Sequence, residues 1–259
     1  MRWTKRGGAG VLAAATALVF IWSAGDARSE QAEPASADET PTPARESLAV
    51  GVAATETAPV ESEQLAVEPP RLVGDPAAGA TKAVVCGACH GPDGNALIPL
   101  FPNLAGQRSD YIAKQLHDFK AGQRVDPVMA GMAATLSDQD IADIAAHFES
   151  GTVKPDTTAP ALAAIGEKIY RKGRPETGLL PCIGCHGPNG EGANGAIDGG
   201  FPAVGGQNPD YLMKQLQSFR AGSRANDWKG IMQTIASRLS DEDIAALIAY
   251  VNSLPQPTD

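Results

Sequence analysis

Residues 86–94 read CGACHGPDG, and residues 182–190 read CIGCHGPNG. The likeness continues on the C-terminal side of both stretches: FPNLAGQRSDYIAKQLHDFKAGQR at 101–124 matches FPAVGGQNPDYLMKQLQSFRAGSR at 201–224, and LSDQDIADIAAHF at 136–148 matches LSDEDIAALIAYV at 239–251. Two copies are too few for a solenoid, which needs three or more repeats. The duplication instead predicts two homologous domains, at 71–154 and 155–259, with the joint near 152–160.

Each copy is expected to be helical. A first helix is expected at 76–86 and 160–173, and a middle helix at 110–120 and 209–219, with Ser109 and Asn208 as candidate N-caps. The last helix is expected from Ser137 and from Ser240, each followed by Asp three residues on, which is a capping-box variant. Its apolar residues recur with the spacing of one buried helix face; they are Ile141, Ile144, Ala145 and Phe148, matched by Ile244, Leu247, Ile248 and Val251. No long alternating stretch indicates a sheet, so the expected fold class is all-α.

The cysteines all lie in two Cys-x-x-Cys-His motifs, which are Cys86, Cys89 and His90 and then Cys182, Cys185 and His186. This is the attachment signature of c-type haem. Two thiols at this spacing can both reach the vinyl groups of one porphyrin, and the next residue, His, then lies under the iron. We therefore expect two covalently bound haem c groups per chain. Their porphyrins would also supply apolar centres to domains in a chain with only 5% aromatic residues.

Other interpretations of the cysteines account for less of the pattern. A four-cysteine zinc site needs its two pairs much closer together than Cys89 and Cys182 are. A thioredoxin-like pair would sit beside a βαβ pattern, which the sequence lacks. Structural disulfides remain an alternative for an exported protein. None of these needs a His after the second Cys, and none needs it twice.

The methionines identify the expected distal ligands. Met129 and Met232 stand at the same distance before the Leu-Ser pair that opens the last helix. A thioether opposite His raises the reduction potential and closes the iron to oxygen chemistry. The expected iron ligands are therefore His90 with Met129, and His186 with Met232. The other two methionines after the first residue have apolar counterparts, since Met132 matches Ile235 and Met213 matches Ala113.

Residues 1–25 are expected to be a signal peptide or a membrane anchor. Arg2, Lys5 and Arg6 precede an uncharged stretch at 7–25, which is the charged n-region and apolar h-region of an export signal. Cleavage after Gly25 or Ala27 and retention as an anchor both remain open. Because the basic flank stays on the cytoplasmic side, either fate delivers the rest of the chain across the membrane.

Residues 26–70 are expected to form a disordered acidic linker rich in Pro and Ala. The segment contains no Phe, Tyr, Trp or Lys, so it cannot bury enough apolar area to offset the entropy of ordering. The whole chain has 21 Lys and Arg against 30 Asp and Glu, a net charge of −9. A general nucleic-acid binder needs a basic footprint, so nucleic acid is excluded as a partner.

Taken together, the motifs quoted above resemble the cytochrome c4 family, over residues 71–254. The resemblance implies two tandem class I cytochrome c domains related by a pseudo-twofold axis, with haem propionates near the interface. It implies a periplasmic electron carrier rather than an enzyme. Its expected partners are a quinol-oxidising bc-type complex, which donates single electrons, and terminal haem–copper oxidases, which accept them. The acidic linker and the anchor, through residues 7–25, are not part of the usual soluble form.

The resemblance also suggests roles for residues around the haems. In class I cytochromes a Pro carbonyl accepts the ring N–H of the ligating His, which assigns this role to Pro102 and Pro202. The basic pairs either neutralise propionates or are solvated surface charges; they are Lys120 with Arg220 and Arg124 with Arg224. His117 and His147 have no counterparts in the second copy and are interpreted as incidental surface residues.

Two alternative functions remain open at this point. The chain could be a cytochrome subunit that accepts electrons from a flavoprotein sulfide dehydrogenase. It could also be a di-haem redox enzyme, which would need an iron that substrate can reach or a special ligand. The sequence has no spare Cys for a thiolate ligand, and each expected haem has its own Met.

Overall fold

The computed structural model describes residues 72–155 and 161–254. The first range is called the first half below, and the second range the second half. The expected signal or anchor at 1–25 and the expected linker at 26–70 lie outside the described residues. Within them, no helix is long and apolar enough to cross a membrane.

The described residues form helices joined by loops, and they contain isolated β-bridges but no strand. The first half contains α1 (Pro76–Lys82), η1 (Ala83–Val85), α2 (Gly87–His90), α3 (Ser109–Lys120), α4 (Pro127–Ala134) and α5 (Asp138–Glu149). The second half contains α6 (Ala163–Lys172), η2 (Pro175–Thr177), α7 (Ile183–His186), α8 (Pro209–Arg220), η3 (Trp228–Gly230), α9 (Ile231–Ala236) and α10 (Asp241–Asn252). The expectation of an all-α fold is confirmed.

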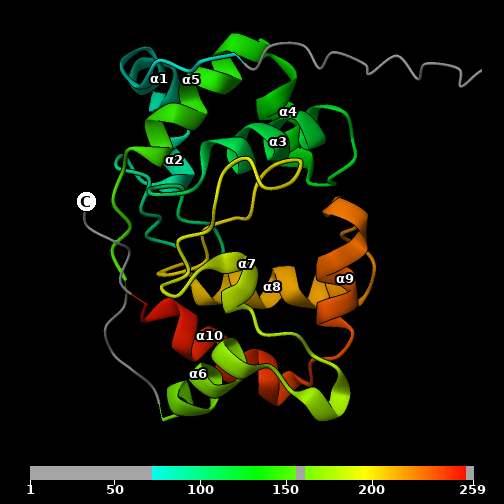
Figure 1. The fold of residues 1–259 in the computed structure, drawn as a ribbon. Helices are drawn as coiled ribbons and strands as arrows, with labels where there is room; N and C mark the ends of the chain where they lie inside the picture. Colours follow the sequence, from blue (N-terminus) through cyan, green and yellow to red (C-terminus); the bar gives the residue numbers. More distant parts are fainter. Residues whose placement is uncertain (1–71, 156–160, 255–259) are drawn as a thin grey trace, which may run out of the picture. The chain divides into compact units, whose positions relative to one another are not determined.

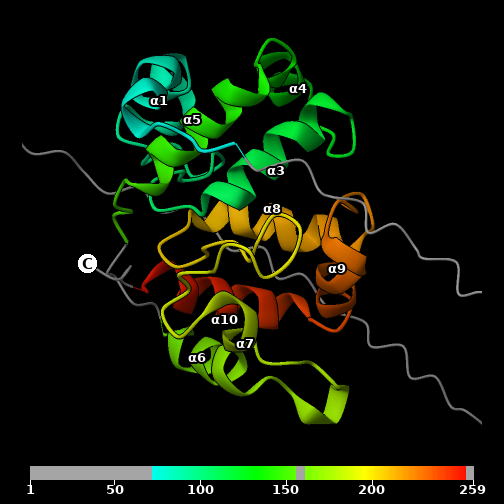
Figure 2. The ribbon, with the colours of Figure 1, turned by 45° about the horizontal axis from the view of Figure 1, so that its top comes forward.

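The first and last helices of each half cross closely (Figure 1), α1 against α5 and α6 against α10. A glycine lies at each crossing. A Cβ atom on Gly79 would lie 2.8 Å from the Cβ of His147, and one on Gly166 would lie 2.8 Å from the Cβ of Tyr250. Each would be closer still to a backbone carbonyl of the facing helix. The glycines therefore allow backbone to pack directly against backbone, and Figure 2 shows the same two pairs from another side.

The last helix of each half begins as its sequence predicts. Ser137 and Ser240 each accept a bond from the backbone N–H three residues on, and Asp140 and Asp243 complete the capping boxes. A basic residue from the start of the same half binds each of these carboxylates. Lys82 Nζ lies 2.7 Å from Asp140 Oδ1, and Arg174 pairs with Asp243. The N-terminal end of α5 and that of α10 are thus each bound to the segment that precedes the Cys-x-x-Cys-His motif of the same half.

The structure differs from the expected helices at several points. The helix expected at 160–173 spans Ala163–Lys172. The first helix ends at Lys82 and continues as a 3-10 turn, and the N-cap of α3 is Arg108, so Ser109 is already helical. The helices α4 and α9 were not expected. Asp126 caps α4 by accepting bonds from the backbone N–H groups of Val128 and Met129, each at 3.1 Å, and a proline occupies its first position.

The glycine crossing predicts a large difference between two alanine substitutions. Gly166→Ala should lower the free energy of unfolding by about 1–3 kcal/mol, because its methyl group meets the backbone of α10. Gly131→Ala is the matched control, since that helical glycine has no other atom within 4 Å of a built Cβ atom. The control should be neutral or stabilising by up to ~1 kcal/mol through helix propensity. Denaturant unfolding measures both, and equal effects would contradict the close crossing.

Asp143 predicts a stability difference that depends on pH. Its carboxylate accepts bonds from the Asp75 N–H, Lys82 and Gln139, and these lower its pKa to about 2. A carboxyl group whose pKa is lowered by folding stabilises the fold at pH values above its unfolded-state pKa. This stabilisation is lost as the pH falls through the folded-state pKa. Asp143→Asn should therefore be less stable than the parent chain at pH 6, and the difference should disappear between about pH 4 and pH 2.

Denaturant unfolding across this pH range measures the effect of Asp143. Asp198→Asn is the control, because the Asp198 side chain is 75% exposed. It should leave the pH dependence of unfolding nearly unchanged. A difference between Asp143→Asn and the parent that stays constant down to pH 2 would contradict the assignment.

Candidate haem sites

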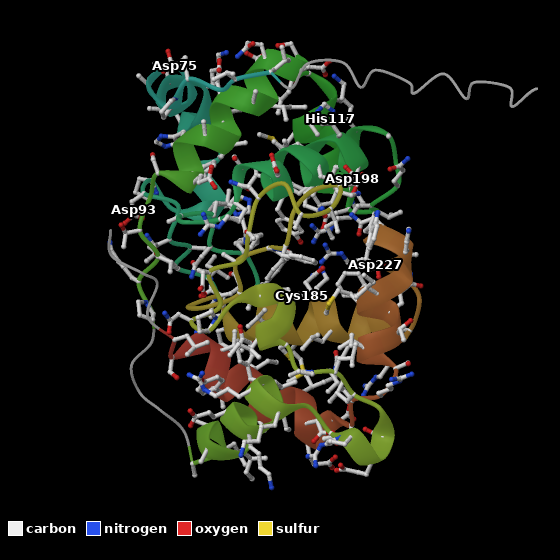
Figure 3. All side chains as sticks on the ribbon, viewed as in Figure 1. Asp75, Asp93, His117, Cys185, Asp198 and Asp227 are labelled. Carbon is white, nitrogen blue, oxygen red and sulfur yellow. The ribbon has the colours of Figure 1, made fainter. Side chains whose placement is uncertain are left out.

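Each Cys-x-x-Cys-His motif forms one helical turn. The N–H of His90 donates to the carbonyl oxygen of Cys86 at 3.0 Å, and the N–H of His186 donates to that of Cys182 at 2.9 Å. The turn therefore holds the first Cys and the His of each motif close together. Cys185 lies on the second of these turns, α7 (Figure 3). None of the four cysteines forms a disulfide.

A glycine in a positive-φ conformation ends each turn. Gly91 has φ +82° and Gly187 has φ +83°, a backbone geometry that favours glycine. A side chain on Gly91 would also collide with the backbone of Asn95. The chain therefore reverses directly after each His and runs into the loop that carries the Phe-Pro pair.

The ring of each His is fixed by the proline that the resemblance assigns. His90 Nδ1 lies 2.9 Å from the carbonyl oxygen of Pro102, and His186 Nδ1 lies 2.9 Å from that of Pro202. The intervening loops differ, since the two partners are 12 residues apart in the first half and 16 in the second. The same hydrogen bond therefore closes loops of unequal length.

This hydrogen bond determines the histidine tautomer. A carbonyl oxygen can only accept, so Nδ1 must carry the proton and Nε2 keeps its lone pair. Burial lowers the pKa of both His90 and His186, although the proline carbonyl opposes this effect. Both rings are thus neutral, with Nε2 as the nitrogen available to a metal. Two thiols and such an imidazole on one turn form the donor set that a covalently attached haem requires.

The thiols nearest the core are held in their protonated form. Burial raises the pKa of Cys86, and it raises the pKa of Cys182 to about 11. Both side chains pack against the apolar core of their own half. A neutral thiol is compatible with addition to a vinyl group on a porphyrin seated in that core.

The two expected distal methionines lie on the helices that sequence reasoning missed. Met129 is on α4 and packs against the first core, and Met232 is on α9. Each stands one helical turn before an alanine with no exposed surface, Ala133 or Ala236, so each shares the inward face of its helix. Met132 corresponds to Ile235, which packs against the second core.

The paired basic residues have two different environments. Lys120 donates to the carbonyl oxygen of Leu136 at 2.5 Å, and Arg220 donates to that of Leu239 at 3.2 Å and to Asp241. These two residues tie the end of α3 or α8 to the start of the last helix. Arg124 and Arg224 lie instead at the interface between the halves.

Arg124 and Arg224 belong to a reciprocal polar cluster. Arg124 donates to the hydroxyl of Tyr211 at 3.0 Å and to Gln215 at 3.0 Å; Arg224 donates to the hydroxyl of Tyr111 at 2.8 Å and to Gln115 at 3.1 Å. Burial opposes ionisation of Tyr211, but the two guanidinium groups outweigh it and lower the pKa of its hydroxyl. Exchanging the two halves converts the contacts of Arg124 into those of Arg224. This equivalence confirms the expected pseudo-twofold relation.

A second reciprocal contact lies beside the proline carbonyls. Gln207 Oε1 accepts the backbone N–H of Asn103 at 2.7 Å, and Gln107 Oε1 accepts that of Ala203 at 2.8 Å. Both glutamines are buried. Sequence reasoning did not single out these glutamines or the tyrosines of the polar cluster. The available signal was that both copies keep the same polar residue at those positions.

The two remaining histidines lie away from these sites. The side chain of His117 is 48% exposed and lies 3.9 Å from Asp138. The ring of His147 packs at a tilt against Phe148, with 5.1 Å between the ring centroids. Neither contact connects them to the Cys-x-x-Cys-His turns.

Comparison with known proteins finds relatives for both halves. A family model described as cytochrome c matches residues 163–255, and one described as cytochrome c oxidase, cbb3-type, subunit III matches residues 75–148. Cytochrome c4 of Pseudomonas aeruginosa is 50% identical over 182 residues, which are 70% of this chain and 89% of that protein. The thiosulfate dehydrogenase electron acceptor of Stutzerimonas stutzeri is 36% identical over 179 residues, 67% of this chain and 81% of that protein.

A solved structure extends the likeness to the fold. The crystal structure of reduced recombinant cytochrome c4 from Pseudomonas stutzeri superposes with a TM-score of 0.66 at 47% identity, covering 70% of this chain and 100% of that one. Two cytochrome c domains, each with its Cys-x-x-Cys-His turn, imply two covalently bound haem c groups, as the sequence predicts. The protein transfers electrons and is not an enzyme. The chain belongs to the cytochrome c4 family.

Proposed function

We propose that this protein accepts single electrons from a quinol-oxidising bc-type complex and passes them to terminal haem–copper oxidases in the periplasm. The observation that carries the proposal is the pair of buried histidines, each with Nδ1 bonded to a proline carbonyl and Nε2 available. A methionine on the inward face of α4 or α9 would supply the second iron ligand of each half. A site closed on both sides suits electron transfer better than substrate binding.

The proposed roles of the residues follow from their chemistry. Cys86 and Cys89 would attach the first haem, and Cys182 and Cys185 would attach the second. His90 with Met129 would hold the first haem iron, and His186 with Met232 would hold the second. When bound, each haem supplies a one-electron iron couple. The chain holds each imidazole in a fixed tautomer and excludes water from it through burial.

The proposed location depends on the export signal. Residues 1–25 would direct the chain across the membrane, and the segment 7–25 would either be removed or remain as an anchor. The linker at 26–70 would then separate the membrane from the domains at 71–154 and 155–259. An acidic segment of this length and composition would suit a tethered carrier that must reach more than one partner.

A second candidate differs in the electron donor. The relative from Stutzerimonas stutzeri is named a thiosulfate dehydrogenase electron acceptor, and its match covers 67% of this chain. The same two haem sites would then accept electrons from a thiosulfate-oxidising enzyme. The two candidates share one redox chemistry and differ in the protein surface that the donor recognises.

The proposed function is tested with the full chain made alongside haem-attachment machinery. Its mass should include two haem adducts, and the reduced protein should bind carbon monoxide poorly because a His and a Met would already hold each iron. Stopped-flow mixing should show rapid reduction by a bc-type complex and rapid oxidation by a haem–copper oxidase. Rapid reduction by thiosulfate dehydrogenase alone would favour the second candidate. Rapid, complete binding of carbon monoxide at neutral pH would contradict an electron carrier with closed sites.

The choice between Met129 and Met132 as ligand gives a further prediction. Met129→Ala should abolish the sulfur-to-iron absorption band of one haem and lower the potential of that haem, because the thioether is lost. Met132→Leu is the control and should keep the band, with a stability cost under ~1.5 kcal/mol for a nearly volume-conserving change. Visible absorption and potentiometric titration measure both effects. The reverse pattern would show that the two halves do not share one distal geometry.

A further inference from the structure

One peptide group in each half serves both the histidine and the opposite half. In the first half it joins Pro102 to Asn103. Its carbonyl accepts His90 Nδ1–H at 2.9 Å, and its N–H donates to Gln207 Oε1 at 2.7 Å. The proximal ring of the first half is therefore linked to a side chain of the second half through a single amide.

The second half repeats this arrangement with the roles exchanged. The peptide between Pro202 and Ala203 accepts His186 Nδ1–H at 2.9 Å and donates its N–H to Gln107 Oε1 at 2.8 Å. Each glutamine also returns a bond to the next carbonyl: Gln107 Nε2 donates to Ala203 at 2.8 Å, and Gln207 Nε2 donates to Asn103 at 2.9 Å. These paired bonds fix the amide of each glutamine in one orientation.

The physical consequence is a coupled pair of hydrogen bonds. An acceptor on the N–H of an amide polarises that amide and makes its carbonyl a stronger acceptor, most of all in a buried site. Both histidines, both glutamines and Asn103 are buried, with at most 9% of their surface exposed. A stronger carbonyl acceptor withdraws the Nδ1 proton further and makes Nε2 a more basic ligand.

We propose that Gln207 is a positioning residue for His90 and that Gln107 is one for His186, so that each half sets the ligand strength of the other half's histidine. This inference rests on the proposed role of both histidines as iron ligands. Neither glutamine touches a histidine, and each acts through the peptide that follows the proline. The effect is in trans, because each glutamine is on the half opposite the histidine that it controls.

The glutamines also have contacts inside their own half, and these define the competing explanation. Gln107 Oε1 accepts the N–H of Arg108 at 2.9 Å, and Gln207 Oε1 accepts that of Asn208 at 2.9 Å. A purely structural role at the start of α3 or α8 would therefore act in cis. The two explanations are distinguished by which half contains the histidine that a glutamine substitution affects.

The test uses the haem-loaded full chain with Gln207→Met, which keeps the side-chain length and removes the hydrogen bonds. In the reduced, diamagnetic protein, NMR should show the Nδ1–H resonance of His90 moving upfield while that of His186 stays in place. Potentiometric titration should show that one of the two haems is reduced more readily. The equilibrium constant for its reduction should rise roughly two- to tenfold. Gln107→Met should move the His186 resonance and leave His90 in place.

Two further variants separate the acceptor from general loosening of the interface. Gln207→Glu keeps an oxygen acceptor and should leave the His90 resonance near or downfield of its parent position. Asn226→Ala removes hydrogen bonds to Gln115 and Asp118 across the same interface. No hydrogen bond joins Asn226 to either proline peptide, so this variant should move neither histidine resonance. The inference is overturned if each methionine variant shifts the Nδ1–H resonance of the histidine in its own half. It is also overturned if each variant shifts both histidine resonances equally, or shifts neither. A parent protein without two His-ligated haems would instead overturn the proposed function.

Discussion

An imidazole can serve as an iron ligand only if one ring nitrogen is kept available, and a proline carbonyl enforces this in both halves. The bond from Nδ1 to Pro102 or Pro202 measures 2.9 Å in each half. This bond is present in both halves although the loop of the second half is longer. The longer loop contains an isolated β-bridge between Ala193 and Phe201. The helical turn, the glycine that reverses the chain and the loop all serve to bring one carbonyl to one ring.

Much of this arrangement could be predicted from local sequence. The Cys-x-x-Cys-His motif determines a turn by itself, and the capping boxes at Ser137 and Ser240 locate the last helices because their partners lie three residues away. The helix α9 could not be located in this way. It follows Lys229, a non-glycine residue with φ +52°, and no local preference indicates such a conformation.

The contacts between the halves were also beyond local reasoning. Gln207 contacts a backbone amide more than a hundred residues away in the chain, and Arg224 contacts Tyr111 at a similar separation. Hydropathy periodicity classifies such residues only as polar. The resemblance implied an interface, but the identity of its hydrogen-bond partners required the fold. Arg124 and Arg224 show this well, since sequence alone left them between solvated charges and neutralising groups.

The two halves use one set of contacts but are not copies of each other. Tyr170 is buried on α6 and donates its hydroxyl to the carbonyl of Gly187, directly after His186, at 2.6 Å. The corresponding position in the first half, counted from the glycine at each crossing, is Ala83, which has no hydroxyl to donate. A symmetric dimer of identical chains would carry every substitution at both sites at once. Fusion of two copies into one polypeptide removes that obligation, so natural selection can alter one redox centre while its twin, held by the same interface, keeps its ancestral chemistry.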